Sequence, residues 1–211
     1  MPVLRNPADR MADIVVLTAH PRLEHSRVNL MLMEAAQQLP AERVMVRDLY
    51  ALYPDYLIDI AAERAVLARA KLLVWQHPLH WYSLPPLLKL WVDEVFGFGW
   101  AYGPGANALR GKDLWMVVST GGSAQAYHPS GHNRHFIDAF WPPHEQTAVL
   151  TGMRFLPPMV VHDAHRVAQR EVAAQSALFA DRLASYPNWP ELADLPDTEP
   201  CDVGPGDRPQ R

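Results

Sequence analysis

Two aromatic residues and two histidines stand together in the segment "WQHPLHWYS", which follows the apolar stretch "KLLV". Trp81 and Tyr82 each combine an apolar ring face with a polar group. The main chain of Leu79 and His80 stands directly beside them. An aromatic pair at the end of a strand is usually part of a core, but next to further polar loops it is typical of a slot for a planar ring.

The segment "STGGSAQAYHPSGHN" holds a second group of side chains with chemical potential. Its first four residues are two hydroxyl residues followed by two glycines. The glycines would let main-chain amides approach a flat ligand closely, but a plain turn would also use glycines. A phenol and two imidazoles follow, and these groups can donate hydrogen bonds or shuttle protons near neutral pH. The alternative for these three is that they are ordinary loop residues. The residues are Ser119, Thr120, Gly121, Gly122, Tyr127, His128 and His132.

A third loop, "TAHPRLEHSRVN", ends where a helix is predicted to begin. Ser26 and Asn29 offer a hydroxyl, free main-chain amides and the positive end of a helix dipole to a phosphate group. His20 could add a further donor. Taken alone this loop is a weak signal, because a serine at such a position is ordinarily only a helix cap.

Other kinds of site fit the sequence less well. No G-x-x-x-x-G-K-[ST] loop is present and no G-x-G-x-x-G follows a strand, which argues against a nucleotide-triphosphate loop and a Rossmann turn. Ser123 in "GGSAQ" departs from the G-x-S-x-G elbow of serine hydrolases. Three histidine pairs have zinc-compatible spacing, but no obvious carboxylate ligand accompanies them, so we expect no metal. These pairs are His128/His132, His132/His135 and His162/His165.

Five apolar stretches rich in β-branched residues predict strands, and they alternate with segments of helical periodicity. The predicted strands cover residues 13–20, 43–50, 71–78, 113–120 and 154–162; the predicted helices cover 27–39, 60–70, 87–96, 145–152 and 165–186. This alternation predicts an α/β sandwich of three layers, with a parallel sheet of order 2-1-3-4-5. A ligand binds at the carboxyl ends of the strands in such a sheet, where the three loops converge.

The composition narrows the functional classes. A chain of 211 residues that is 49% hydrophobic can bury one substantial core. A net charge of -4 gives no basic field, so a nucleic-acid partner is not expected. No apolar run approaches the roughly 20 residues of a membrane-spanning helix, and the N-terminal stretch lacks a signal-peptide core, so a cytoplasmic protein is expected.

The chain divides into one domain and two flanking segments. We expect residues 13–186 to form the domain, residues 1–12 to be a flexible extension, and residues 187–211 to be a proline-rich tail that is disordered or lies on the surface. The single cysteine, Cys201, lies in this tail, which excludes an intramolecular disulfide and argues against a thiol nucleophile. The pair Pro157-Pro158 predicts a bulge or an edge in the fifth strand.

Several motifs, in their order along the chain, resemble one known family. They are "AHP" followed by S-x-x-N, then "WQHPLHWYSLPPLLKLWVDEVF", "GWAYGPG", "TGG" and "FLPP". From about residue 13 to residue 186 the chain resembles the flavodoxin-like NAD(P)H:quinone oxidoreductases, the family of DT-diaphorase. It is most similar to the ancillary oxidoreductases of Kef potassium-efflux systems and to general NAD(P)H oxidoreductases. The resemblance implies a flavodoxin-like fold, bound FMN or alternatively FAD, and NAD(P)H as reductant.

The resemblance also implies roles for particular residues. The first loop would hold the phosphate end of the flavin, and the loops after the third and fourth strands would border its ring. Tyr127 and His132 would be catalytic, because they would stabilise or protonate the oxygen of a quinone-like acceptor. The cofactor-binding residues would be His20, Ser26, Arg27, Val28, Asn29, Leu79, His80, Trp81, Tyr82, Ser119, Thr120, Gly121 and Gly122.

Two positions depart from the family pattern. His80 stands where the family often has glutamine, and Ser119 where it often has threonine. Both residues keep hydrogen-bonding capacity, so we expect flavin binding to persist while the potential or substrate preference shifts.

The resemblance implies a two-electron, ping-pong transfer from NAD(P)H through the flavin to quinones or related electrophiles. The predicted helix 87–96 is apolar over much of its circumference, and family members dimerise near it, so a homodimer is expected. Burial of that helix inside one domain is the alternative. Two other functions stay open: a regulatory subunit of a Kef-type potassium efflux protein at the inner membrane face, and a flavodoxin-like electron carrier.

Overall fold

One parallel sheet of five strands forms the centre of the protein. The computed structural model describes residues 12–196. Its strands are β1 (Ile14–Thr18), β2 (Val44–Asp48), β3 (Leu72–Pro78), β4 (Asp113–Ser119) and β5 (Arg154–Val161). They pair in the order β2-β1-β3-β4-β5, and every pair is parallel. The predicted fold class and strand order are therefore confirmed.

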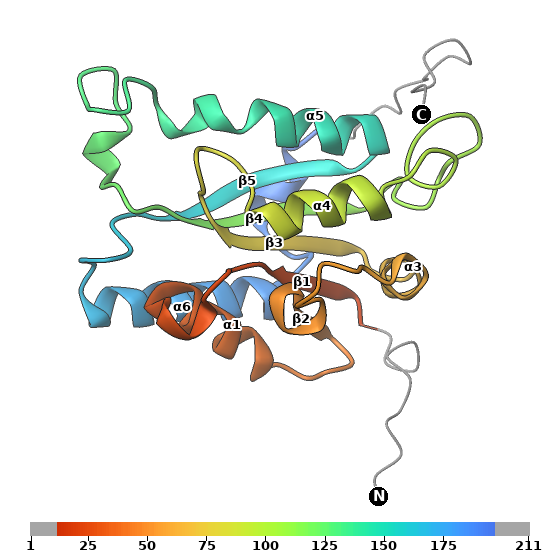
Figure 1. The fold of residues 1–211 in the computed structure, drawn as a ribbon, viewed down its shortest axis with the longest axis horizontal. Coiled ribbons are helices and arrows are strands. Elements are labelled where there is room, and N and C mark those ends of the chain that lie inside the picture. The colour runs from red at the N-terminus through yellow and green to blue at the C-terminus, as the bar shows by residue number, and fades with distance from the viewer. Residues whose placement is uncertain (1–11, 197–211) are drawn as a thin grey trace, which may run out of the picture.

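Helices cover both faces of the sheet (Figure 1). One face carries α1 (Arg27–Gln37) and α6 (Gln169–Ser185), which pack against each other. The other face carries α3 (Ile60–Leu67), α4 (Pro86–Val95) and α5 (Pro142–Thr151), and the short α2 (Leu49–Leu52) follows β2. Short 3-10 helices are η2 (Leu23–His25), η3 (Ala124–Ala126), η4 (Ile137–Phe140) and η5 (Pro190–Ala193).

The central strands are buried on both faces, which explains why their sequences show no alternation of apolar and polar residues. Every residue of β1 and β4 is buried. Successive side chains of β3 point to opposite faces, so Trp75 packs in the core beneath α4 and α5, while Val74 packs beneath α1 and α6. The carboxyl ends of the central strands therefore lie between two hydrophobic cores, one on each face of the sheet.

Element boundaries follow local capping chemistry. The predicted second strand reached residue 50, but Asp48 accepts hydrogen bonds from the amides of Tyr50 and Ala51 and so starts α2. The last helix begins at Gln169 instead of at residue 165, which leaves His162 to Ala168 as a loop at the carboxyl end of β5. Helix α5 starts earlier than predicted, with Pro142 in its first turn.

Strand β5 is the outer strand next to β4, and its two prolines lie at an irregularity. The pairing register shifts between Trp115 and Val117 of β4, opposite Pro157 and Pro158. Proline cannot donate to a strand ladder, so it is tolerated at an edge or a bulge. The prediction for this pair is confirmed.

Residues 187–196, the described part of the predicted tail, pack on the domain. Trp189 and Leu192 are buried, and the Trp189 ring lies 4.9 Å from that of Trp115. The indole of Trp189 also donates a hydrogen bond to the carbonyl of Arg182. Counting prolines and acids overlooked these two large apolar side chains. Residues 1–11 and 197–211, including Cys201, lie outside the described residues.

Candidate functional site

A cavity of about 650 Å³ opens at the carboxyl ends of the central strands. All three loops singled out from the sequence reach it, together with the loop after β5. Because parallel strands end at the same edge of a sheet, residues more than 140 positions apart meet there. The lining residues are His20, Arg22, His25, Ser26, Arg27, Asn29, Pro78, Leu79, His80, Ser119, Thr120, Gly121, Ala164 and His165.

The loop after β1 leads into the first turn of α1. Ser26 is the N-cap of this helix, and its hydroxyl accepts hydrogen bonds from the main-chain amide and the side-chain amide of Asn29. The amides of the first helical turn have no partner within the helix, so the helix offers donors and a positive dipole end at the cavity. Arg27 donates to the carbonyl of Val167, which ties α1 to the loop before α6.

The predicted phosphate residues divide into two groups. His20, Ser26, Arg27 and Asn29 line the cavity. Val28 does not line it, because its side chain is buried in the core beneath α1. Any contribution of Val28 to a ligand is therefore limited to its main chain.

The loop after β3 forms a tight two-residue turn. His80 and Ser83 exchange main-chain hydrogen bonds of 3.1 and 2.9 Å, and the two central residues, Trp81 and Tyr82, have φ angles of 48° and 65°. Residues other than glycine rarely adopt positive φ, and those that do cluster at ligand sites. The turn leaves the Trp81 side chain 92% exposed.

The loop after β4 faces this turn. The amide of Leu79 donates to the carbonyl of Ser119 at 2.8 Å, so the two loops lie side by side. A Cβ on Gly122 would lie only 3.3 Å from the side chains of Ala126 and Tyr127, which accounts for glycine at this close approach. Thr120 donates its hydroxyl to the carbonyl of Gly122 at 2.7 Å and fixes the loop from within.

Tyr127 and His132 meet the turn in a smaller cavity of about 210 Å³. This cavity shares Leu79 with the larger one. Tyr82 closes one side, with its ring stacked 5.0 Å from Phe140 and its hydroxyl donating to Asn133 at 3.2 Å. The lining residues are Leu79, Trp81, Tyr82, Gly122, Tyr127, His132 and Asn133. The two predicted catalytic side chains therefore lie with the predicted ring-binding residues.

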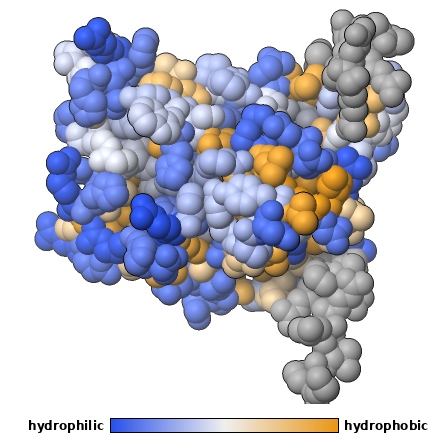
Figure 2. All heavy atoms as spheres, viewed as in Figure 1, coloured by the Kyte–Doolittle hydropathy of each residue, from blue (hydrophilic) through white to orange (hydrophobic). Residues whose placement is uncertain are grey.

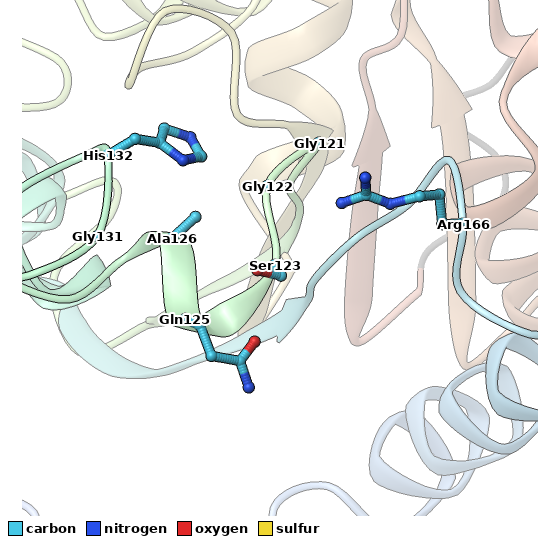
Figure 3. A pocket seen from close by; sticks show the side chains of 8 residues that line it. All are labelled: Gly121, Gly122, Ser123, Gln125, Ala126, Gly131, His132 and Arg166. Atoms are coloured by element: carbon cyan, nitrogen blue, oxygen red, sulfur yellow. The ribbon is translucent and has the colours of Figure 1, made fainter.

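A third cavity, of about 550 Å³, is lined in part by the Gly121-Gly122 loop, and Figure 3 shows its lining residues. His132 stands at one side of it and Arg166 at the other. Arg166 is held by the carboxylate of Asp163 at 2.7 Å. His132 thus borders both the aromatic cavity and this more open one.

The electrostatics of the larger cavity favour an anion. Its lining contains two arginines and four histidines and no carboxylate. The rings of His20 and His80 lie 6.2 Å apart. Burial lowers the pKa of both imidazoles, and their mutual repulsion lowers the pKa of His20 further. Burial raises the pKa of the Tyr127 phenol, so this group stays protonated and able to donate at neutral pH.

Sequence reasoning missed several lining residues. Arg22 and His25 lie inside the first loop and could have been found by following that loop to its end. His165 was missed because the last helix was predicted to begin at that residue, and Ala164 lies just before it in the loop after β5. Among residues 12–196, no cluster of three or more histidine, cysteine, aspartate or glutamate side chains could hold a metal ion. In the same part of the chain, no helix is long and apolar enough to span a bilayer.

The fold has counterparts among known proteins. Residues 12–183 match the Flavodoxin_2 family model, described as a flavodoxin-like fold. A solved structure of a thermophilic tryptophan halogenase from Streptomycin violaceusniger is 37% identical, with a TM-score of 0.76 over 79% of this chain and 96% of that chain. General stress protein 14 from Treponema denticola, solved in complex with FMN, is 34% identical, with a TM-score of 0.78 over 82% of this chain and 98% of that chain.

A third structure, an NADPH-quinone reductase from P. pentosaceus, is 26% identical, with a TM-score of 0.72 over 82% of this chain and 98% of that chain. The family match covers the whole sheet and all three loops of the site. We conclude that the chain belongs to the flavodoxin-like Flavodoxin_2 family, and the resemblance to the NAD(P)H:quinone oxidoreductases is confirmed at the level of this family.

Proposed function

We propose that the chain is an NAD(P)H oxidoreductase that uses bound FMN to transfer two electrons, by a ping-pong route, to quinones or related electrophiles. The observation that carries this proposal is that two cavities adjoin at the carboxyl ends of the strands, with Leu79 in the lining of both. The larger cavity is rich in hydrogen-bond donors and holds the positive charge of two arginines. The smaller cavity is lined largely by aromatic side chains. A phosphate-bearing ligand with a planar ring fits such a pair.

The donor set suits the phosphate end of FMN. Ser26, Arg22 and the first turn of α1 offer a hydroxyl, a guanidinium and main-chain amides, and the lining contains no acidic side chain that would repel a phosphate. The FMN complex of general stress protein 14 supports FMN over the alternative, FAD. The three similar solved structures carry names of different proteins, so the proposed acceptor rests on the residues of the site.

The planar end of the cofactor would lie between two loops. The Trp81-Tyr82 turn and the Thr120-Gly121-Gly122 loop would border it, with Leu79 beneath. When bound, FMN would supply the two-electron redox chemistry between NAD(P)H and the acceptor. The protein would orient the reactants. A single slot beside Tyr127 would serve reductant and acceptor in turn, which is the physical basis of ping-pong kinetics.

Tyr127 and His132 would act on the acceptor oxygen. The Tyr127 phenol is protonated at neutral pH because burial raises its pKa, so it can donate a hydrogen bond as negative charge develops on that oxygen. His132 is exposed and lines the same cavity, where its ring could donate a hydrogen bond to the acceptor oxygen. NAD(P)H as the reductant is consistent with the family.

Spectroscopy of the purified protein tests the cofactor directly. A flavin absorption spectrum is expected, and the compound released on denaturation should be FMN. Sustained oxidation of NADH or NADPH should then require a quinone. A colourless protein that takes up neither FMN nor FAD would reject the proposal. Rapid reduction of the bound flavin by NAD(P)H in a single turnover, without a quinone, would also argue against a plain electron carrier.

The Tyr127→Phe variant tests the proposed donor. Loss of one well-placed donor should slow quinone reduction about 100-fold while the flavin content stays unchanged. Tyr186→Phe is a matched control, because that phenol donates to Asp113 at the opposite end of β4. An unchanged rate for Tyr127→Phe would remove this residue from the mechanism. The regulatory role with a Kef-type protein stays a prediction from the resemblance.

The proposal includes a homodimer formed through α4. Leu87, Leu88, Trp91 and Val95 of this helix are buried within the chain. Leu90 and Val92 stay only partly buried, and Figure 2 shows apolar side chains gathered over α3 and α4. A second copy that covers this face would remove the exposed apolar surface from water.

A further inference from the structure

We infer that Gln76 and Thr18 are positioning residues for the cofactor: through Asn29 they hold the hydroxyls of Ser26 and Ser119 as hydrogen-bond donors toward the phosphate end of the flavin. The inference rests on the proposed function and goes one step further, because neither Gln76 nor Thr18 lines the cavity. It assigns a function to two polar side chains on the innermost strands of the sheet.

A continuous chain of hydrogen bonds links these residues beneath the cavity. The Thr18 hydroxyl donates to Gln76 Oε1 at 2.8 Å. Gln76 Nε2 donates to the main-chain carbonyl of Asn29 at 2.8 Å and lies 3.5 Å from Asn29 Oδ1. Asn29 Nδ2 then donates to Ser26 Oγ at 3.0 Å and to Ser119 Oγ at 2.8 Å.

The chain is buried almost completely. Thr18 and Gln76 are 0% exposed, and Asn29 is 1% exposed. A buried polar group without a partner costs about 1–3 kcal/mol, so each side chain is confined to the one arrangement that satisfies it. Such a network is rigid when every member has a partner.

Main-chain groups fix the direction of the bonds at Gln76 and Thr18, and the 3.5 Å approach of Gln76 Nε2 to Asn29 Oδ1 favours the orientation in which Asn29 Nδ2 faces the two serines. A carbonyl can only accept, so the Gln76 atom that faces the carbonyl of Asn29 must be Nε2. Gln76 Oε1 therefore faces Thr18, and Thr18 has to donate. At the other end a main-chain amide can only donate, so Ser26 Oγ accepts from the amide of Asn29 as well as from its side chain.

The consequence appears at the cavity. Ser26 accepts two hydrogen bonds from Asn29 and Ser119 accepts one, so the proton of each hydroxyl is left for another acceptor. Within residues 12–196 neither hydroxyl donates to a protein group, and both side chains line the cavity. Two hydroxyls fixed as donors match the acceptor oxygens of a phosphate. Asn29, whose amide protons go to these serines, acts on the ligand through them.

The comparison of FMN with riboflavin tests this inference, because riboflavin has the same ring and no phosphate. Dissociation constants of both flavins for the full-length, flavin-free protein can be measured by quenching of flavin fluorescence. In Gln76→Leu, Asn29 loses the partner that orients it. We expect FMN affinity to fall about tenfold, which corresponds to about 1.4 kcal/mol. Riboflavin affinity should change less than about twofold, because riboflavin lacks the phosphate toward which the two hydroxyls would donate.

Two further variants separate positioning from packing. Val74→Ala removes buried volume from the same face of β3 without touching the network, so it should leave the ratio of the two dissociation constants unchanged. Thr18→Val is nearly isosteric and lies at the far end of the chain of bonds, so it should shift the ratio in the same direction as Gln76→Leu. It keeps the test decisive if Gln76→Leu does not fold.

Gln76→Glu supplies a conservative rescue. A protonated carboxyl can accept from Thr18 and donate to the carbonyl of Asn29, as the amide does, and burial favours this neutral form. Relative to the unchanged protein at each pH, FMN binding should be retained at low pH and lost as the pH rises and the carboxyl ionises. Gln76→Leu should show no such step, since it carries no titratable group.

The outcomes are distinct. Equal weakening of FMN and riboflavin in Gln76→Leu and Thr18→Val, or no change in either, overturns the positioning role while flavin binding stands. Equal affinity of the unchanged protein for FMN and riboflavin also overturns it, because the serines would then hold no phosphate. An unchanged protein that binds neither flavin overturns the proposed function itself.

Discussion

Replacement of Trp189 by alanine should destabilise the whole domain, although this residue lies beyond the last long helix. Its ring is 5% exposed and packs 4.9 Å from Trp115 and 5.7 Å from Tyr186. Its indole nitrogen donates to the carbonyl of Arg182 at 2.8 Å, and the Arg182 guanidinium lies 5.0 Å above the ring. Removal of a buried tryptophan leaves a cavity and costs about 3–5 kcal/mol.

Urea and thermal unfolding measure this effect. The loss is a large share of the roughly 5–15 kcal/mol that stabilises a typical domain. For a protein of this length it should lower the midpoint of thermal unfolding by about 10 °C. Trp81→Ala is the matched control, because the Trp81 side chain is 92% exposed and its removal should change stability by less than about 0.5 kcal/mol. A loss of less than about 1 kcal/mol for Trp189→Ala, on the scale of an ordinary surface change, would show that residues 187–196 do not belong to the core.

Two further predictions concern β3 and α4. Burial lowers the pKa of His77 to about 3, below its value of about 6.5 in the unfolded chain. The unfolded chain therefore binds the proton first, and the free energy of unfolding falls by about 1.4 kcal/mol per pH unit as the pH falls from about 6.5 toward 3. Urea unfolding at pH 7 and pH 5 tests this: between these two pH values, His77→Phe should lose about 2 kcal/mol less stability than the unchanged protein. Equal losses in the two proteins would refute the prediction. Leu90→Asp places a charge on the apolar face of α4, so it should convert the proposed dimer into a monomer in sedimentation experiments. Leu178→Asp is the control, because it lies on α6, on the other face of the sheet, and should leave the dimer intact. A monomeric unchanged protein would refute the proposed dimer.

The sequence predicts the fold and the location of the site well, because both depend on signals that are local. Apolar stretches bounded by proline, glycine and histidine mark the strands, and the loops that follow β1, β3 and β4 contain the unusual side chains. Parallel pairing then brings the ends of these strands together. His80 and Ser119 were placed at the cavity by this reasoning, and the structure locates both in its lining.

The remaining features depend on tertiary packing. Tyr82 lies against Phe140 across 58 residues, and Trp189 lies against Trp115 across 74, and nothing in the local sequence marks either partner. The start of α6 at Gln169 was missed because the apolar periodicity continues through the preceding loop. His165 therefore appeared to be helical, while it lies in the lining of the cavity.

Gln76 illustrates why a buried polar residue can be more informative than an exposed one. The four residues of β3 that precede Gln76, Leu72 to Trp75, are all apolar. A leucine at position 76 would pack there without needing a hydrogen-bond partner. The amide is tolerated only because Thr18 and Asn29 satisfy it. Among residues 12–196, the side chains of Thr18, Gln76 and Asn29 hydrogen-bond only to one another, to the carbonyl of Asn29 and to the two serines. A buried polar network of this kind costs free energy if its only role is structural. The site supplies the reason for this cost, since the hydroxyl protons that the network directs are the ones that a phosphate would accept.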